Sequence, residues 1–145
     1  MIKILCVGKI KENYLNEWIL DYQRRINKFH KLIIEEVKDD ESILKEEESI
    51  MKKISPKDFV VTLEILGNQL DSMEFAKKLD ELFICNSSIV FVIGGSNGLS
   101  ENVKMRSNMK LSFSKMTFPH GMFRAILLEQ IYRAFKINNN ETYHK

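Results

Sequence analysis

The chain has 145 residues, a formal net charge of +2 and 44% hydrophobic residues. This length fits one globular domain over 1–145, and no apolar run approaches the roughly 20 residues of a membrane-spanning helix. The apolar start, Met1 to Gly8, is too short for a secretory signal, so we expect a cytoplasmic protein. Cys6 and Cys85 are expected to be buried thiols, and the histidines are too scattered for a zinc site.

Charge is distributed unevenly along the chain. Residues 35–48 hold eight acids and two bases, whereas residues 104–145 hold eight bases and two acids. An anionic partner for the C-terminal third would explain this asymmetry. A solvated helix face with scattered Lys and Arg would explain it equally well.

Hydrophobic periodicity predicts strands and helices in alternation. In chain order we expect a strand at 1–7, a helix at 13–28, a strand at 31–37, a helix at 40–54, a strand at 59–65, a helix at 71–84, a strand at 88–93, a short helix at 100–106, a short strand at 109–113 and a long helix at 122–137. Gly67 and Asn68 should end the third strand, and Asp71 or Ser72 should cap the next helix. The alternation indicates a single α/β domain with a mostly parallel sheet.

The most informative stretch runs from Ile89 to Ser100. Five apolar residues, typical of a strand buried on both faces, lead into a loop with three glycines. Glycine adopts positive φ and lets a ligand approach the backbone, and ligands of open α/β sheets bind at the carboxyl ends of strands. The loop is a candidate cofactor site; a tight connection that binds nothing is the alternative. Valine at Gly94 or Gly98 should weaken cofactor binding and leave the fold intact.

A second candidate loop, residues 112–119, mixes apolar and hydroxyl residues and ends in Pro119. Two backbone-rich loops at strand ends could bind an adenine-like group through main-chain N–H and C=O groups. A plain strand-to-helix connection is the alternative. The chain lacks a phosphate-binding P-loop, a GxGxxG after the first strand and a GxSxG nucleophile elbow, which disfavours those enzyme classes.

The C-terminal helix and tail carry further candidates. Arg124 and Arg133 could each be a surface charge or a phosphate contact. The helix offers more apolar surface than packing against one sheet face obviously needs, which favours a dimer. An internal core would also explain this surface. The residues that provide it are Phe123, Ile126, Leu127, Ile131 and Phe135. The last three residues combine an aromatic ring, an imidazole and a base, but a chain terminus is usually frayed.

Together, several motifs closely resemble the ribosomal RNA large-subunit methyltransferase H family of small SPOUT-class enzymes. The resemblance extends over the whole chain, and the motifs that carry it are Phe91–Leu99, Leu111–His120, Arg124, Glu129–Lys136 and Tyr143–Lys145. The segment near 38–50 departs from the family pattern because it looks shorter and acidic. Members methylate N3 of a pseudouridine in large-subunit (23S) ribosomal RNA with S-adenosyl-L-methionine.

The resemblance implies a five-stranded SPOUT fold with helices on both faces, a C-terminal trefoil knot, and a homodimer with its active site near the subunit interface. Positions that match the cofactor site are Leu63, Gly94, Phe113, Ser114, Lys115, Met116, Thr117 and Phe118. Candidate catalytic residues are His144, Arg124 and Tyr143, and candidate substrate-binding residues are His120, Arg133 and Lys145. The implied partner is ribosomal RNA in the ribosome or large subunit, and neither a metal nor a membrane is expected.

These residue types suit the implied chemistry. Methyl transfer depends on holding a nucleophile in line with the methyl carbon. The N3–H of pseudouridine must give up its proton, to His144 or to water. Arg124 could hold a phosphate or charge on the base carbonyls, and Tyr143 could stack on the uracil ring. A non-enzymatic RNA-binding or ribosome-associated module is the main alternative, and a nucleotide-binding protein of another chemistry is a third.

Overall fold

The computed structural model describes residues 1–145, in which five strands and five helices alternate along the chain. The strands are β1 (Ile2–Val7), β2 (Leu32–Val37), β3 (Phe59–Gln69), β4 (Ile89–Ile93) and β5 (Met109–Ser112). The helices are α1 (Asn13–Asn27), α2 (Ile43–Lys52), α3 (Ser72–Cys85), α4 (Glu101–Arg106) and α5 (His120–Asn138). The predicted alternation is confirmed, with differences at several element ends.

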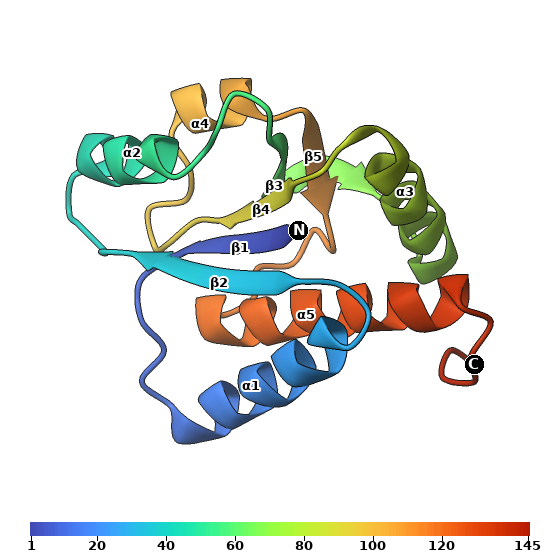
Figure 1. Ribbon diagram of the computed structural model, residues 1–145. Coiled ribbons are helices and arrows are strands. Elements are labelled where there is room, and N and C mark those ends of the chain that lie inside the picture. Colours follow the sequence, from blue (N-terminus) through green and yellow to red (C-terminus); the bar gives the residue numbers. More distant parts are fainter.

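The strands form one sheet in the order β2-β1-β4-β3-β5, and every pairing between them is parallel. A parallel sheet must be covered on both faces. Helices α2 and α4 lie on one face, and α1, α3 and α5 lie on the other (Figure 1). The central strand β4 is apolar on both faces. Its Phe91 belongs to the apolar cluster under α5, and its Val90 and Val92 belong to the cluster under α4. The α/β class with helices on both faces is confirmed, and the trefoil knot stays a prediction.

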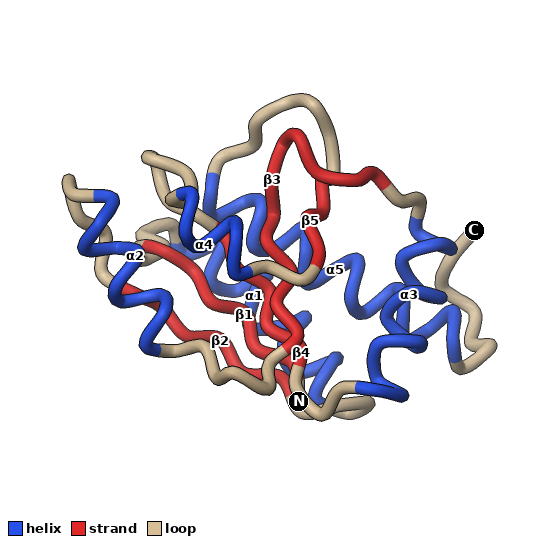
Figure 2. Tube along the Cα trace, turned by 90° about the horizontal axis from the view of Figure 1, so that it is seen from above, coloured by secondary structure: helices blue, strands red, loops and turns tan.

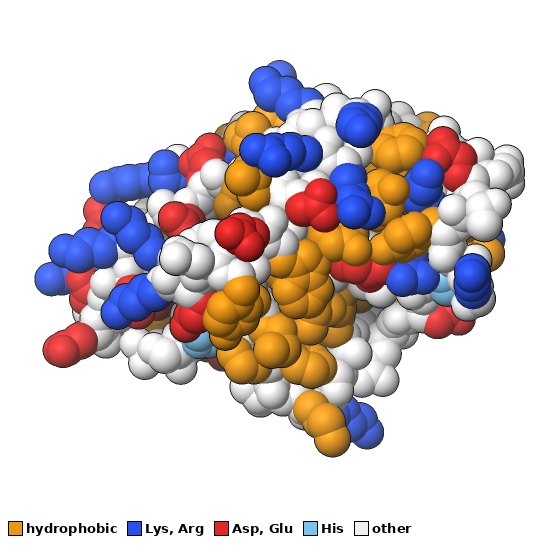
Figure 3. Space-filling view, turned by 90° about the horizontal axis from the view of Figure 1, so that it is seen from below, with side chains coloured by type: hydrophobic (Ala, Val, Ile, Leu, Met, Phe, Trp, Pro, Cys, Tyr) orange, Lys and Arg blue, Asp and Glu red, His pale blue; other side chains and the backbone are white.

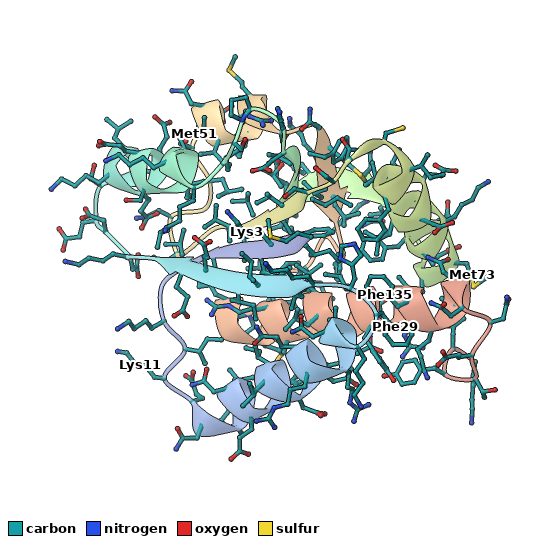
Figure 4. All side chains as sticks on the ribbon, in the orientation of Figure 1. Lys3, Lys11, Phe29, Met51, Met73 and Phe135 are labelled. Carbon is teal, nitrogen blue, oxygen red and sulfur yellow. The ribbon has the colours of Figure 1, made fainter.

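Helix α5 is largely internal. Leu127, Ile131 and Phe135 are all buried, so most of the apolar stripe on this helix fills the core. Phe135 also stacks on Phe29 near the end of α1, with ring centroids 5.6 Å apart (Figure 4). Phe123 and Ile126 remain partly exposed, so this stripe gives less support for a dimer than the sequence suggested, and the homodimer stays a prediction.

Strand β3 does not end at Gly67 and Asn68, as the sequence predicted. It continues to Gln69 after a register shift between Leu63 and Asn68 in its pairing with β5. A Cβ on Gly67 would lie 2.9 Å from the backbone of Leu111, so glycine is required where β3 crosses close to β5. The glycine therefore marks an irregularity inside the strand and not its end.

Three smaller expectations also need correction. Helix α2 is shorter than 40–54 because Asp40 accepts the backbone N–H of Ser42 in a turn before the helix. Helix α5 begins at His120, directly after Pro119, and not at 122.

The two cysteines differ in burial. Cys85 is exposed, whereas Cys6 is buried and its burial raises the pKa of the thiol to about 12. No helix is both long and apolar enough to span a bilayer.

Candidate functional site

A cavity of about 550 Å³ opens at the carboxyl ends of β3, β4 and β5. Its walls come from three segments: the irregular part of β3 at 63–66, the glycine loop at 94–99, and the loop at 113–118. The last of these follows β5 and arches over to the start of α5 (Figure 2). The two loops that the sequence selected therefore meet at one site.

The glycine loop owes its shape to its own close contacts. The N–H of Gly98 donates to the carbonyl of Gly95 over 3.0 Å, and Gly98 has φ +70°. A Cβ on Gly94 would lie 2.8 Å from the backbone of Gly98. Ser100 ends the loop and caps α4, since its Oγ accepts the N–H of Val103. The loop is thus tightly folded, and its glycines serve that folding first.

Valine at Gly94 is therefore expected to destabilise the fold, contrary to the prediction that it leaves the fold intact. The new side chain would overlap backbone atoms, which cannot move aside cheaply, so we expect a loss of at least about 2 kcal/mol. Gly98→Ala has open space around its Cβ and should cost only about 1–2 kcal/mol for its positive φ. Thermal unfolding of both variants tests the contrast, and a wild-type unfolding midpoint for Gly94→Val would contradict it.

The loop at 113–118 is anchored to both neighbours. Ser112 Oγ donates to the carbonyl of Ile65 over 2.8 Å, which ties the end of β5 to β3. Phe113 packs edge-on against Phe123 of α5, with centroids 5.2 Å apart. Of the predicted cofactor residues, those that line the cavity are Leu63, Gly94, Phe113, Ser114, Met116, Thr117 and Phe118, and His120 lines it too. Lys115 is exposed and does not line it.

Sequence reasoning missed two charged residues of the cavity. Glu64 and Lys104 both line it, from β3 and α4. Thr62 Oγ1 donates to Glu64 Oε2 over 2.6 Å. The signal available in the sequence was weak. Glu64 follows Thr62 by two residues near the end of the strand predicted at 59–65, and an acid at such a position is common on strand faces that contact solvent.

Arg124 lies near the cavity but does not line it. Its side chain is 5% exposed, and Nη1 contacts Glu36 Oε2 at 2.6 Å. Nη2 donates to the carbonyl of Gly8 over 3.2 Å, while Nε is buried without a partner. The guanidinium therefore ties the second turn of α5 to the carboxyl ends of β1 and β2.

The C-terminal tail is not frayed against solvent. The hydroxyl of Tyr143 lies 3.0 Å from that of Tyr22 and donates to Glu129 over 3.3 Å. Arg133 donates to the same carboxylate through Nε at 2.9 Å, and its guanidinium lies 4.8 Å from the Tyr143 ring centroid. Arg133 Nη1 also contacts His144 Nδ1 at 3.1 Å. The pKa of Tyr143 is raised mainly by burial and further by the contacts with Tyr22 and Glu129. This phenol therefore stays protonated at neutral pH.

A family model described as "Predicted SPOUT methyltransferase" matches residues 1–144. The chain belongs to the SPOUT methyltransferase family. A relative from Clostridium botulinum, named ribosomal RNA large subunit methyltransferase H, is 48% identical over 157 residues that cover 99% of each chain. Because those 157 positions exceed the 145 residues of this chain, the relative has residues without a counterpart here.

Two solved structures share the SPOUT fold. A probable methylase family protein from Haemophilus influenzae Rd KW20 gives a TM-score of 0.58 at 16% identity, covering 99% of this chain and 70% of its own. The SpoU methyltransferase AviRb from Streptomyces viridochromogenes, solved in complex with AdoMet, gives a TM-score of 0.50 at 11% identity, covering 90% of this chain and 56% of its own. The SPOUT fold that the sequence implied is confirmed.

The predicted site residues of this SPOUT chain fall into two groups at opposite ends of α5. His120 lines the cavity at the first residue of the helix, whereas Arg133 lies thirteen residues further on, about 20 Å along the helix axis. Tyr143 and His144 lie beside Arg133, and Lys145 is exposed at the terminus. No group of three or more His, Cys, Asp or Glu side chains is placed to hold a metal ion.

Proposed function

We propose that this chain uses S-adenosylmethionine to methylate N3 of a pseudouridine in large-subunit ribosomal RNA. Membership of a methyltransferase family and a relative named for a ribosomal RNA enzyme support methyl transfer to ribosomal RNA. The single observation that carries the proposal is the cavity, which the two backbone-rich loops form together at the carboxyl ends of the strands. A protein of this kind works where ribosomes are, which favours the cytoplasm.

The cavity fits the cofactor in size and character. Its volume of about 550 Å³ lies within the range of roughly 300–1,000 Å³ that is usual for small-molecule sites. Leu63, Leu111 and Phe113 give it an apolar wall suited to a nucleoside, and the glycine loop offers backbone groups nearby. When bound, S-adenosylmethionine supplies a methyl group on a sulfonium that an in-line nucleophile can accept. AviRb, a protein of similar fold, was solved with this cofactor.

The tail residues suit the nucleotide. A guanidinium has only N–H donors, so the contact between Arg133 Nη1 and His144 Nδ1 requires the lone pair of that imidazole nitrogen. The hydrogen of a neutral imidazole then sits on Nε2, which makes His144 a donor. We infer that His144 donates to a uracil carbonyl and that water takes the N3 proton, while Tyr143 stacks on the ring. Arg133 and Lys145 supply positive charge for phosphate.

A homodimer would bring the two groups together. One subunit cannot bring a tail about 20 Å along α5 to its own cavity without undoing the Tyr143 contacts. A tail from a second subunit could reach it instead. Exposed apolar side chains support such an interface: Tyr14 and Leu20 of α1 are 68% and 45% exposed, and Met122 of α5 is 39% exposed. Hydrophobic side chains gather on the face of the molecule seen from below (Figure 3).

We expect the chain to sediment at twice its 17.0 kDa mass at micromolar concentration. Tyr14→Glu combined with Met122→Glu should yield a folded monomer, because burying two carboxylates in an apolar interface is unfavourable. Ile84→Glu is the matched control, since Ile84 is 81% exposed on α3, a different helix from those that carry Tyr14 and Met122. An unaltered chain that sediments at 17.0 kDa would contradict the homodimer, and an unchanged mass in the double variant would contradict this interface.

Calorimetric titration with S-adenosylmethionine, followed by transfer of labelled methyl groups to ribosomes, tests the proposed function. We expect saturable cofactor binding and label in large-subunit RNA. The competing binding module would bind RNA without heat from the cofactor. That result would overturn the methyltransferase proposal.

A further inference from the structure

The two charged residues of the cavity lie on one face of the sheet. Side chains alternate along a strand, so Thr62 and Glu64 share the face of Val60. Val60 packs in the same apolar cluster as Val103 of α4, and Lys104 is the next residue of that helix. Glu64 and Lys104 therefore form a polar end of the cavity under α4. The opposite end lies toward α5 and is largely aromatic, since Phe113 packs on Phe123 there, and it also carries His120.

Glu64 is held in place by a fully buried neighbour. Thr62 is 0% exposed and donates its hydroxyl to Glu64 Oε2 at 2.6 Å. Threonine is stiff about χ1, so this contact fixes the direction of the carboxylate. Glu64 forms no ion pair within the chain and is the one acid of the cavity lining. Its Oε1 remains available to a cationic ligand group.

Lys104 is equally available. Its only ion pair is with Glu101, at 3.6 Å, and the side chain of Glu101 is 86% exposed. Such solvent-exposed pairs are weak and exchange easily for a better partner. The polar end of the cavity thus presents one fixed carboxylate and one mobile ammonium group.

We propose that Glu64 and Lys104 recognise the α-amino-acid end of the cofactor, with Glu64 accepting from its ammonium group and Lys104 donating to its carboxylate. This inference rests on the proposed function. One negative and one positive side chain match the two charges of an α-amino acid, and the aromatic end matches the nucleoside. The pair is therefore a specificity determinant for the aminocarboxypropyl group.

Calorimetry with two ligands tests the inference, since 5′-deoxy-5′-methylthioadenosine lacks the amino-acid end. Glu64→Gln and Lys104→Met should each weaken S-adenosylmethionine binding by about tenfold to a hundredfold, the effect of a lost hydrogen bond between charged groups. Binding of methylthioadenosine should change by less than about threefold. Glu101→Gln, which removes the other acid near Lys104, is the matched control and should leave both affinities unchanged.

The outcomes separate this inference from the proposed function. Unchanged affinity for S-adenosylmethionine in Glu64→Gln and Lys104→Met would overturn the inference alone. Equal losses for both ligands, in variants with wild-type thermal unfolding, would overturn it in favour of a ribose contact. An unaltered chain that binds neither ligand would overturn the proposed function, and this inference with it.

Discussion

Deletion of residues 143–145 is expected to abolish methyl transfer and to leave the affinity for S-adenosylmethionine within about twofold of the intact chain. The physical reason is that residues 63–66, 94–99 and 113–118 form the cavity walls and none of the tail residues lines the cavity, whereas Tyr143 contacts Tyr22 of α1 and Glu129 of α5. The tail should therefore serve the nucleotide. Methyl incorporation into ribosomes, measured beside a cofactor titration, checks both halves of the expectation.

A milder variant separates the tail's position from its chemistry. Tyr143→Phe keeps the ring over Arg133 and removes the hydroxyl that contacts Tyr22 and Glu129, so we expect a partial loss of activity. Full activity in the truncated chain would contradict the prediction and show that residues 143–145 have no role in methyl transfer. Loss of cofactor binding on truncation would place the tail in the cofactor cavity.

Arg124→Met is expected to lower the free energy of unfolding by about 2 kcal/mol and methyl transfer with it. The substitution leaves the carbonyl of Gly8 and the carboxylate of Glu36 without their partner. The cost is below that of a fully buried pair because the Glu36 side chain is 36% exposed and can be hydrated. Chemical denaturation with calorimetric cofactor titration measures these effects.

Glu36→Gln tells a positioning role of Arg124 from direct contact with substrate. If Arg124 acts by holding α5 against β1 and β2, Glu36→Gln should lose stability and activity together, in smaller measure than Arg124→Met. If Arg124 touches RNA or the reacting base, Arg124→Lys should lose activity at wild-type stability while Glu36→Gln stays active. The second pattern would contradict the positioning account.

The sequence predicted the strands and helices of this fold because buried parallel strands and amphipathic helices have strong periodic signals. It failed at Gly67, where glycine was taken as a strand end. Glycine is required there because the backbone of Leu111 on the neighbouring strand leaves no room for a side chain. A contact between residues so distant in the chain leaves no local signal in the sequence. Cys85 was expected to be buried but is exposed at the end of α3. Whether another element covers a helix end depends on tertiary packing, which the local sequence does not show.

The candidate site was predicted in part. The glycine loop and the loop at 113–118 were found because strand-end loops carry local composition signals, and they do meet. Glu64 and Lys104 were missed because an acid and a base separated by forty positions become neighbours only through strand β3 and helix α4 packing together. The division of the remaining candidates between the two ends of α5 likewise depends on helix length and tail packing, which motif matching does not convey.

Nucleoside mass spectrometry of large-subunit RNA tests the central claim most directly. Ribosomes that lack this methylation would be incubated with the protein and S-adenosylmethionine, and the RNA digested to nucleosides. We predict one new nucleoside, a pseudouridine heavier by one methyl group, with the methyl on N3. RNA that gains no methyl group, or gains it on ribose or on a base other than pseudouridine, would contradict the account.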